Sequence, residues 1–298
     1  MEEFDVIVIG GGMIGLAFTL ELSRKKNFKI AIIEANECNP KVSSSFHTRV
    51  SAITPSSKDF LSSINVWDDI KRKQGFVATK VWDQNSHGSL NFYAKDEGIE
   101  HLGFIVENDL IQSALYNAID QTKVQVIHAK LNDLIKTDFG YQITLDNDQS
   151  FLCKLVVGAD GPKSKVRSLA GIEVSSHDYQ QKAIIANIVS DKSLESTTWQ
   201  RFLSDSILAL LPLSKNQASI VWSCKARLAD ELEELDINKF NQSLSEAAEY
   251  RFGNLKLQSS RNIFPLVSRS AKNYTLSNLA LIGDAAHNIH PLAGQGAN

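Results

Sequence analysis

The 298-residue sequence has only three cysteines, Cys38, Cys153 and Cys224, and no two of them form a CxxC pair. A structural zinc site or a dithiol redox centre needs thiols that lie close together. The sequence therefore argues against both kinds of site, and against the flavin disulfide reductases, which use a dithiol centre. We expect reduced thiols and no metal site.

Long apolar runs and basic clusters are also missing. Apolar runs such as Ile207 to Leu213 are far too short to span a bilayer. The formal net charge of −3 gives no reason to expect a nucleic-acid partner. The first apolar run, Phe4 to Ile9, leads directly into a glycine loop, so we interpret it as a strand and not as a signal peptide. These features predict a soluble, cytoplasmic protein.

The start of the chain has the pattern of a strand–helix–strand unit. A buried strand is predicted over Asp5 to Ile9, and the glycine turn Gly10 to Gly15 follows it. A helix is predicted over Leu16 to Lys26, and a second strand over Lys29 to Ile33 ends at Glu34. This arrangement predicts a Rossmann-type nucleotide-binding βαβ unit.

Each residue type in the glycine turn has a reason to be there. Gly10 permits a tight turn, Gly12 lets the backbone approach a pyrophosphate, and Gly15 lets helix and strand pack closely. Glu34 is predicted to accept hydrogen bonds from ribose hydroxyls and to repel a 2′-phosphate, which argues against NADP at this position. Met13, Ile14 and Ala35 are predicted to line the same site. NAD and FAD both remain open on this motif alone.

The rest of the chain reads as a second region followed by a return to the first. Segments 79–82 and 89–93 are predicted to form a hairpin, and 108–120 a helix capped by Asn108. Residues 229–252 are predicted to be a charged, helix-forming stretch. Strands over 182–189, 207–211 and 218–226 predict a largely antiparallel sheet. We expect a nucleotide domain over 1–180, with 75–100 contributing to the substrate region, a substrate-binding sheet domain over 181–265, and a return to the nucleotide domain over 266–298.

Three ordered motifs resemble those of group A flavoprotein monooxygenases, and in particular the ubiquinone-biosynthesis hydroxylase branch. Residues 157–167 resemble the ADGxxSxVR motif, 281–287 the GDAAH motif, and 290–298 the HPxAGQGxN signature. Shorter segments that also resemble this branch are 49–53, 65–67, 199–202 and 208–213. The resemblance covers the whole chain and implies FAD as the cofactor. It implies an α/β fold: a Rossmann-like FAD-binding domain of three layers (ββα) with an inserted, mostly antiparallel sheet domain, as in p-hydroxybenzoate hydroxylase.

The resemblance also implies where FAD is held. It gives Asp284 a contact with the ribityl chain, Arg49 a contact near the pyrophosphate, and Asp160 a place near the phosphates. Backbone N–H groups of the closing glycine loop approach the flavin ring, where they stabilise negative charge. Gly161, Gln112, Gly283, Ala297 and Asn298 complete the expected cofactor contacts, and Pro291, Gly294, Gln295 and Gly296 form the expected environment of the reactive ring, with no acid or base among them.

One segment departs from the family pattern. The helix that follows Phe104 to Val106 often begins with an arginine in this family, but here the sequence reads Glu107-Asn108-Asp109. This acidic start weakens the expectation that the helix contacts the FAD phosphates, although Gln112 within it is still expected to lie along the cofactor.

The implied reaction has two stages. Reduced nicotinamide, NAD(P)H, or another electron donor reduces the flavin, and dioxygen then forms a C4a-hydroperoxide that hydroxylates a polyprenylated phenol in ubiquinone biosynthesis. The substrate is expected between the flavin and the sheet domain, against an apolar wall of Trp199, Phe202, Leu208, Leu210 and Trp222. A polyprenylated substrate implies peripheral contact with the inner membrane, or a ubiquinone-biosynthesis protein complex.

Other interpretations stay open at this point. The chain could be another group A phenol hydroxylase, or a non-catalytic FAD-fold scaffold in a biosynthetic complex. A flavin-dependent halogenase is disfavoured because the WxWxIP signature is absent. An NAD-linked dehydrogenase is disfavoured because the GDAAH and GQGxN elements would have no role. The sequence also ends at Asn298, directly after a glycine loop, from which we expect a truncated chain that binds FAD weakly or not at all.

Overall fold

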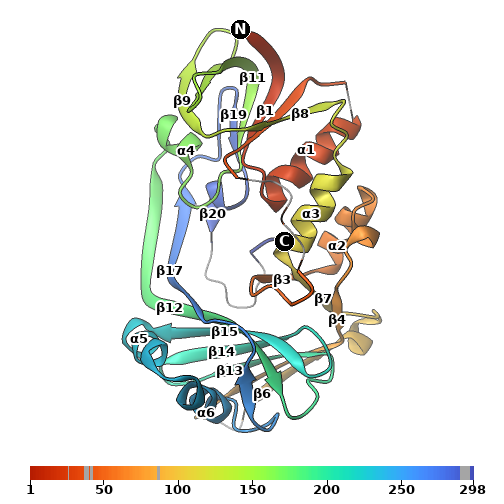
Figure 1. Cartoon of the computed structure of the whole chain (residues 1–298), viewed down its shortest axis with the longest axis vertical. Coiled ribbons are helices and arrows are strands. Elements are labelled where there is room, and N and C mark those ends of the chain that lie inside the picture. Colours follow the sequence, from red (N-terminus) through yellow and green to blue (C-terminus); the bar gives the residue numbers. More distant parts are fainter. Residues whose placement is uncertain (26, 37–39, 41–42, 86–87, 289–295) are drawn as a thin grey trace.

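The computed structural model describes residues 1–25, 27–36, 40, 43–85, 88–288 and 296–298. Figure 1 shows two large sheets at opposite ends of the molecule, with α1 and α3 beside the first and α5 and α6 on the outer side of the second. The long strands β12 and β17 run side by side along one edge and connect the two sheets. The predicted fold class, a Rossmann-like FAD-binding domain with an inserted antiparallel sheet, is confirmed.

The first sheet has eight strands and a parallel centre. Its order is β18-β19-β11-β1-β2-β8, and β10 and β9 extend it antiparallel from β11. β1 pairs parallel with both β2 and β11, and β19 pairs parallel with β11. The strands are β1 (Glu2–Ile9), β2 (Ile30–Glu34), β8 (Val124–His128), β9 (Leu131–Lys136), β10 (Tyr141–Leu145), β11 (Ser150–Gly158), β18 (Thr275–Leu276) and β19 (Leu279–Leu281).

This sheet is covered on both faces, which explains its continuous apolar strands. In β1, Val6 and Val8 pack into the core under the helices, whereas Ile7 and Ile9 pack into the core on the opposite face. The helical layer consists of α1 (Met13–Lys25), α2 (Pro55–Ser63), the short η1 (Trp67–Asp69) and α3 (Asn108–Ala118); α4 (Lys165–Leu169) and β9–β10 lie on the other face. The predicted buried strand and its helix are confirmed.

The second sheet has nine strands in the order β20-β17-β12-β15-β14-β13-β5-β6, with β16 paired to β12. Every pair is antiparallel except β13 with β5, which is parallel and attaches the predicted hairpin β5–β6 to this sheet. The strands are β5 (Ala78–Asp83), β6 (Ser89–Tyr93), β12 (Val174–Ser190), β13 (Thr197–Phe202), β14 (Ser206–Pro212), β15 (Gln217–Lys225), β16 (Leu255–Leu257), β17 (Asn262–Ala271) and β20 (His287–Asn288). β12 and β17 run across residues 180 and 265, and the domain division at those residues stays a proposal.

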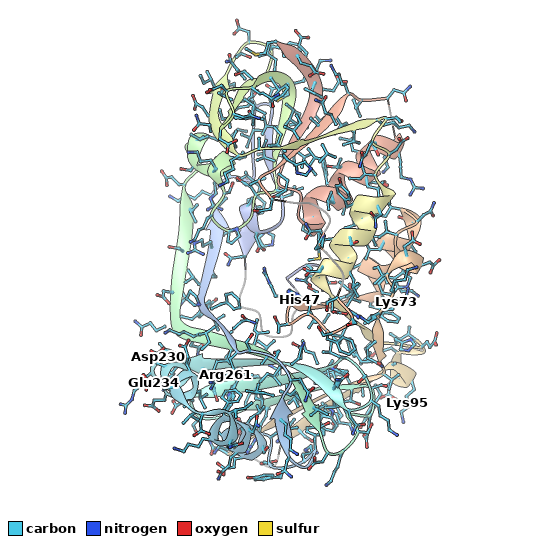
Figure 2. The ribbon with its side chains drawn as sticks, viewed as in Figure 1. His47, Lys73, Lys95, Asp230, Glu234 and Arg261 are labelled. Carbon is cyan, nitrogen blue, oxygen red and sulfur yellow. The ribbon has the colours of Figure 1, made fainter. Side chains whose placement is uncertain are left out.

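The helix-forming stretch predicted over residues 229–252 consists largely of two helices. The segment forms α5 (Ala226–Glu234) and α6 (Ile237–Ala247), which are separated at Leu235 and Asp236. The Asp236 carboxylate accepts hydrogen bonds from the N–H groups of Asn238 and Lys239, both at 3.0 Å, and so starts a new helix. Both helices pack on one face of the nine-stranded sheet, and Arg261, labelled beside them in Figure 2, donates hydrogen bonds to carbonyls at the end of α5.

A small three-stranded sheet lies between the two large ones. It consists of β3 (Val50–Ile53), β7 (Gly103–Glu107) and β4 (Gln74–Phe76), all antiparallel. Its residues Ala52, Phe76 and Ile105 pack with Val221 and Leu211 of the nine-stranded sheet in a shared core. Two short 3₁₀ turns, η2 (Ala94–Glu97) and η3 (Gly283–Ala285), complete the described elements.

The structure describes the state of two cysteines and the character of the helices. Burial raises the pKa of the Cys153 and Cys224 thiols to about 12, so both stay protonated at neutral pH and are poor nucleophiles. Among the described helices, none has the length and apolar character needed to cross a membrane.

Candidate cofactor and substrate site

The glycine turn after β1 is built for close backbone contact. Gly10 has φ +115°, and a Cβ atom there would lie 2.3 Å from the carbonyl oxygen of Ala159. A Cβ on Gly15 would lie 1.9 Å from the carbonyl oxygen of Gly10. At Gly12, by contrast, no atom of the described residues beyond its two chain neighbours lies within 4 Å of the Cβ position. The first two glycines are therefore required by the fold, whereas Gly12 leaves open space at the start of α1.

Glu34 at the end of β2 is joined directly to this turn. Its Oε2 accepts a hydrogen bond from the Gly11 N–H at 2.7 Å, and its Oε1 accepts one from the Asn36 N–H at 2.9 Å. On the other side, the amide of Gln112 in α3 donates to the Gly11 carbonyl at 2.9 Å. Glu34 and Gln112 thus hold the turn, and Ala35 follows as an exposed residue.

The second motif lies beside the first, because β11 is the parallel neighbour of β1. The Asp160 Oδ2 accepts hydrogen bonds from the N–H groups of Lys165 and Val166 at 2.7 and 3.0 Å, at the start of α4. Its buried Oδ1 has no hydrogen-bond partner among the described residues. The buried Arg167 donates to the carbonyls of Pro162 at 3.0 Å and Ala285 at 2.8 Å, and so ties the second motif to the third.

The third motif follows β19 and faces the first. Gly283 has φ +57°, and a Cβ there would approach the side chain of Ile14 to 3.2 Å. Solvent reaches Asp284 from the open cavity, yet the surrounding protein raises the pKa of its carboxyl group by disfavouring the charged form. The charges of Arg49 and His287 oppose this shift but do not cancel it.

All three motifs open onto one cavity of about 530 Å³. Gly12, Arg49 and Asp284 lie in its wall, together with the residues Met13, Ile14, Gly161, Gly283, Gly296, Ala297 and Asn298. Its opposite wall is the inner face of the nine-stranded sheet, with Ala183, Ile185 and Val221. The opening glycine turn and the closing Gly283-Asp284 turn therefore face a shared space, as an extended dinucleotide requires.

Residues 3–298 match the family described as the FAD binding domain. The chain belongs to this FAD binding domain family. Among its relatives, the ubiquinone biosynthesis monooxygenase COQ6 of Danio rerio is 33% identical over 349 residues, covering 100% of this chain and 72% of that protein. The 3-demethoxyubiquinol 3-hydroxylase of Escherichia coli strain K12 is 33% identical over 303 residues, covering 100% of this chain and 76% of that protein.

Solved structures of other proteins show a similar fold. The probable FAD-dependent monooxygenase pqsL of Pseudomonas aeruginosa has a TM-score of 0.81 at 18% identity, over 100% of this chain and 82% of that one. Aklavinone-11 hydroxylase, solved with FAD and aklavinone, has a TM-score of 0.75 at 16% identity, over 100% of this chain and 60% of that one. The resemblance to group A flavoprotein monooxygenases and FAD as the cofactor are confirmed.

The residues present fit FAD. The open space at Gly12 lies at the N-terminus of α1, where unpaired N–H groups and the helix dipole favour a pyrophosphate. Asp284 offers a carboxylate for hydroxyl groups farther along the same cavity. At the closing loop, the Asn298 amide accepts from the Thr54 N–H at 2.9 Å and donates to the Ala52 carbonyl at 2.8 Å, which fixes Ala297 and Asn298 against β3. Pro291, Gly294 and Gln295 lie outside the described residues, and individual contacts with FAD stay predictions.

Most of the expected apolar substrate wall lies on the wrong face of its sheet. Trp199, Leu208, Leu210 and Trp222 are buried among the side chains of α5 and α6, where Trp222 also contacts Phe240. Phe202 is 37% exposed. Because side chains alternate along a strand, the neighbours of the buried residues face the cavity instead. On β12 and β15 these are Ala183, Ile185, Ser219 and Val221.

The helix at residue 108 also differs from expectation. Asn108 is the first residue of α3 and does not cap it; the cap position belongs to Glu107, whose side chain does not bond to the helix. The Asn108 side chain instead accepts a hydrogen bond from the Ser51 hydroxyl at 2.8 Å. Glu107 is 3% exposed and forms an ion pair with Arg72. The sequence showed only that an acidic residue stands at this position and did not predict its partner.

Asp284→Asn is expected to make the cofactor-free protein more stable at neutral pH. The raised native pKa means that folding disfavours the charged carboxylate, and asparagine removes that charge. The difference should shrink as the pH falls through the raised native pKa and vanish below the ordinary carboxyl pKa, where Asp284 is neutral in both states. Urea unfolding of both proteins across this pH range checks the prediction, and an Asn variant that is less stable at neutral pH would contradict it.

Proposed function

We propose that this protein is an FAD-dependent monooxygenase that hydroxylates the aromatic ring of a polyprenylated phenol in ubiquinone biosynthesis. The observation that carries the proposal is the single cavity bounded by the FAD motifs on one side and an apolar sheet face on the other. The names of the two relatives above support the substrate class, since both act in ubiquinone biosynthesis or on a ubiquinol.

The chain's own residues bind and orient the reactants. Gly12 and the N-terminus of α1 receive the pyrophosphate, Glu34 the adenosine ribose, and Asp284 the ribityl hydroxyls. Ile185 and Val221 exclude water from the side on which a phenol ring would lie. When bound, FAD supplies the transfer of electrons from NAD(P)H or another donor to dioxygen and the oxygenation of the ring.

We further infer peripheral contact with a membrane surface, on its own or within a complex of ubiquinone-biosynthesis proteins. This inference follows from the proposed substrate, because each buried CH₂ of a prenyl chain favours the bilayer by about 0.8 kcal/mol.

The proposal is tested by incubating the purified protein with FAD, NADH or NADPH, and a prenylated phenol in detergent. We expect oxygen consumption that depends on the phenol, and a product heavier by one oxygen atom. A matched simple phenol without a prenyl chain should react more slowly. Bound FAD with no oxygenated product from either phenol would contradict the proposal and favour a scaffold role.

A further inference from the structure

A partly buried ion pair lies beside the cofactor cavity and has no role in the function described so far. Arg72 donates to both oxygens of Glu107, from Nε to Oε2 and from Nη2 to Oε1, each at 2.9 Å. The same Oε1 accepts a hydrogen bond from the His47 N–H at 2.7 Å. A carboxylate that is 3% exposed would be costly without such partners, and here a two-point guanidinium pair and a backbone donor satisfy it.

Arg72 also forms hydrogen bonds with the backbone of the segment Ser43 to Thr48, which we call the anchor loop. Its Nη1 donates to the carbonyls of Ser43 and Ser44 at 2.8 and 3.0 Å, and its Nη2 donates to the Ser45 carbonyl at 3.3 Å. Its guanidinium lies 5.2 Å from the centre of the Phe46 ring. Three successive carbonyls can reach one guanidinium only if the chain curls around it, so this residue fixes the shape of the loop.

The nine-stranded sheet holds the anchor loop from its other side. The Asn187 amide donates to the Phe46 carbonyl at 2.8 Å. The Thr48 hydroxyl accepts from the Asn262 amide at 3.1 Å, and the Thr48 carbonyl accepts from the Ser219 hydroxyl at 3.4 Å. The loop is therefore attached both to the cofactor half and to the sheet that forms the opposite wall of the cavity. Figure 2 shows His47 of this loop in the middle of the molecule, between the two sheets.

The anchor loop leads directly into Arg49, which lines the same cavity as Asp284 and interacts with its charge. The Arg49 N–H donates to the His47 Nδ1 at 3.3 Å, and its carbonyl accepts from the Asn108 N–H at 3.0 Å. Because both neighbours belong to the network around Glu107, the place at which Arg49 enters the cavity depends on the ion pair.

We propose that Arg72 and Glu107 are positioning residues that fix the anchor loop and, through it, set the position of Arg49 at the FAD site. The proposal rests on the proposed role of Arg49 in FAD binding. Neither is among the described residues that line the cofactor cavity. Their effect reaches it through the backbone of Ser43 to Arg49.

The test compares Arg72→Gln, Arg72→Lys and Arg49→Gln with the unsubstituted protein. Arg72→Gln is expected to weaken FAD binding about tenfold, measured by flavin fluorescence titration. Arg72→Lys should be nearly as weak, because an ammonium group cannot span two carboxylate oxygens and three carbonyls. In a protein that already carries Arg49→Gln, adding Arg72→Gln should weaken FAD binding by less than about a further twofold, because its effect passes through Arg49.

Arg201→Gln is the matched control. Arg201 likewise combines an ion pair, here to Glu249, with a hydrogen bond to a backbone carbonyl, that of Ala247 at 2.7 Å. Its side chain is 7% exposed, compared with 28% for Arg72. It lies under α6, far from the anchor loop in the fold. Its loss should lower the thermal midpoint as Arg72→Gln does, yet leave the FAD dissociation constant within about twofold.

A second measurement separates this proposal from the proposed function. Amide hydrogen exchange of His47 in the cofactor-free protein should be at least about tenfold faster in Arg72→Gln, since its acceptor Glu107 is released. If Arg49→Gln leaves FAD affinity unchanged, the role of Arg49 is wrong, while faster exchange still supports loop positioning. Unchanged exchange and unchanged FAD affinity in Arg72→Gln, or equal FAD loss in Arg201→Gln, would overturn the proposal.

Discussion

Gly12→Ala is expected to weaken FAD binding by at least about 100-fold while leaving the fold intact. A methyl group fits at Gly12, since among the described residues only its two chain neighbours lie within 4 Å of the Cβ position. Its backbone φ lies outside the left-handed region, so we expect the free energy of unfolding to change by less than about 1 kcal/mol. The same methyl group would occupy the space that a pyrophosphate needs to reach the N-terminus of α1. Calorimetric titration with FAD and urea unfolding measure the two effects.

Gly15→Ala provides the contrast. Its Cβ would lie 1.9 Å from the Gly10 carbonyl oxygen, a backbone atom that cannot move without displacing β1 from α1. We expect this variant to lose at least about 1–3 kcal/mol of stability, because the added methyl group overpacks the core, and to lose FAD binding as well. A Gly12→Ala protein that binds FAD with unchanged affinity would contradict the placement of the pyrophosphate.

Ile185→Trp is expected to lower kcat/KM for the phenol substrate by at least about 100-fold, which corresponds to about 2.7 kcal/mol. Ile185 lies on the inner face of the nine-stranded sheet, in the wall of the cavity opposite Asp284. An indole at this position fills the volume in which the ring would lie, whereas the FAD motifs are on the other side. The FAD dissociation constant should therefore change by less than about twofold.

The neighbouring residue provides the matched control. Ile184 is fully buried on the opposite face of the same strand, against α5 and α6. Ile184→Ala should cost about 2–5 kcal/mol of stability and leave the KM of the folded enzyme for the phenol unchanged. If the effects were reversed, with Ile184 controlling turnover and Ile185 only stability, the assignment of the two sheet faces would be wrong.

The nucleotide half could be predicted from the sequence because its determinants are local. Gly10, Gly15 and Glu34 belong to one strand–helix–strand unit, and each is required by contacts within or next to that unit. The third motif could be placed near the first only through the resemblance to a family. Its physical basis, the parallel pairing of β1 with β11 and of β11 with β19, joins segments that are far apart in sequence.

The substrate wall could not be predicted because both faces of the nine-stranded sheet are apolar. Ile184 and Ile185, or Val221 and Trp222, are equally hydrophobic neighbours, and only the position of α5 and α6 decides which of them is core. The prediction chose Trp199 and Trp222 because they are large aromatic residues. In the structure their side chains fill the core between the sheet and helices α5 and α6 and do not line the cavity. The Arg72–Glu107 pair escaped prediction for a related reason, since its residues meet only in the folded chain.

The central claim is that the turns at Gly12 and Asp284 hold the same FAD molecule. Titration of the purified protein with FAD, followed by flavin fluorescence, tests it most directly when Gly12→Ala and Asp284→Ala are measured in parallel. We predict one FAD per chain and a weaker affinity for this single event in both variants. Unchanged affinity in either variant would contradict the claim, because the two turns would then not share a ligand.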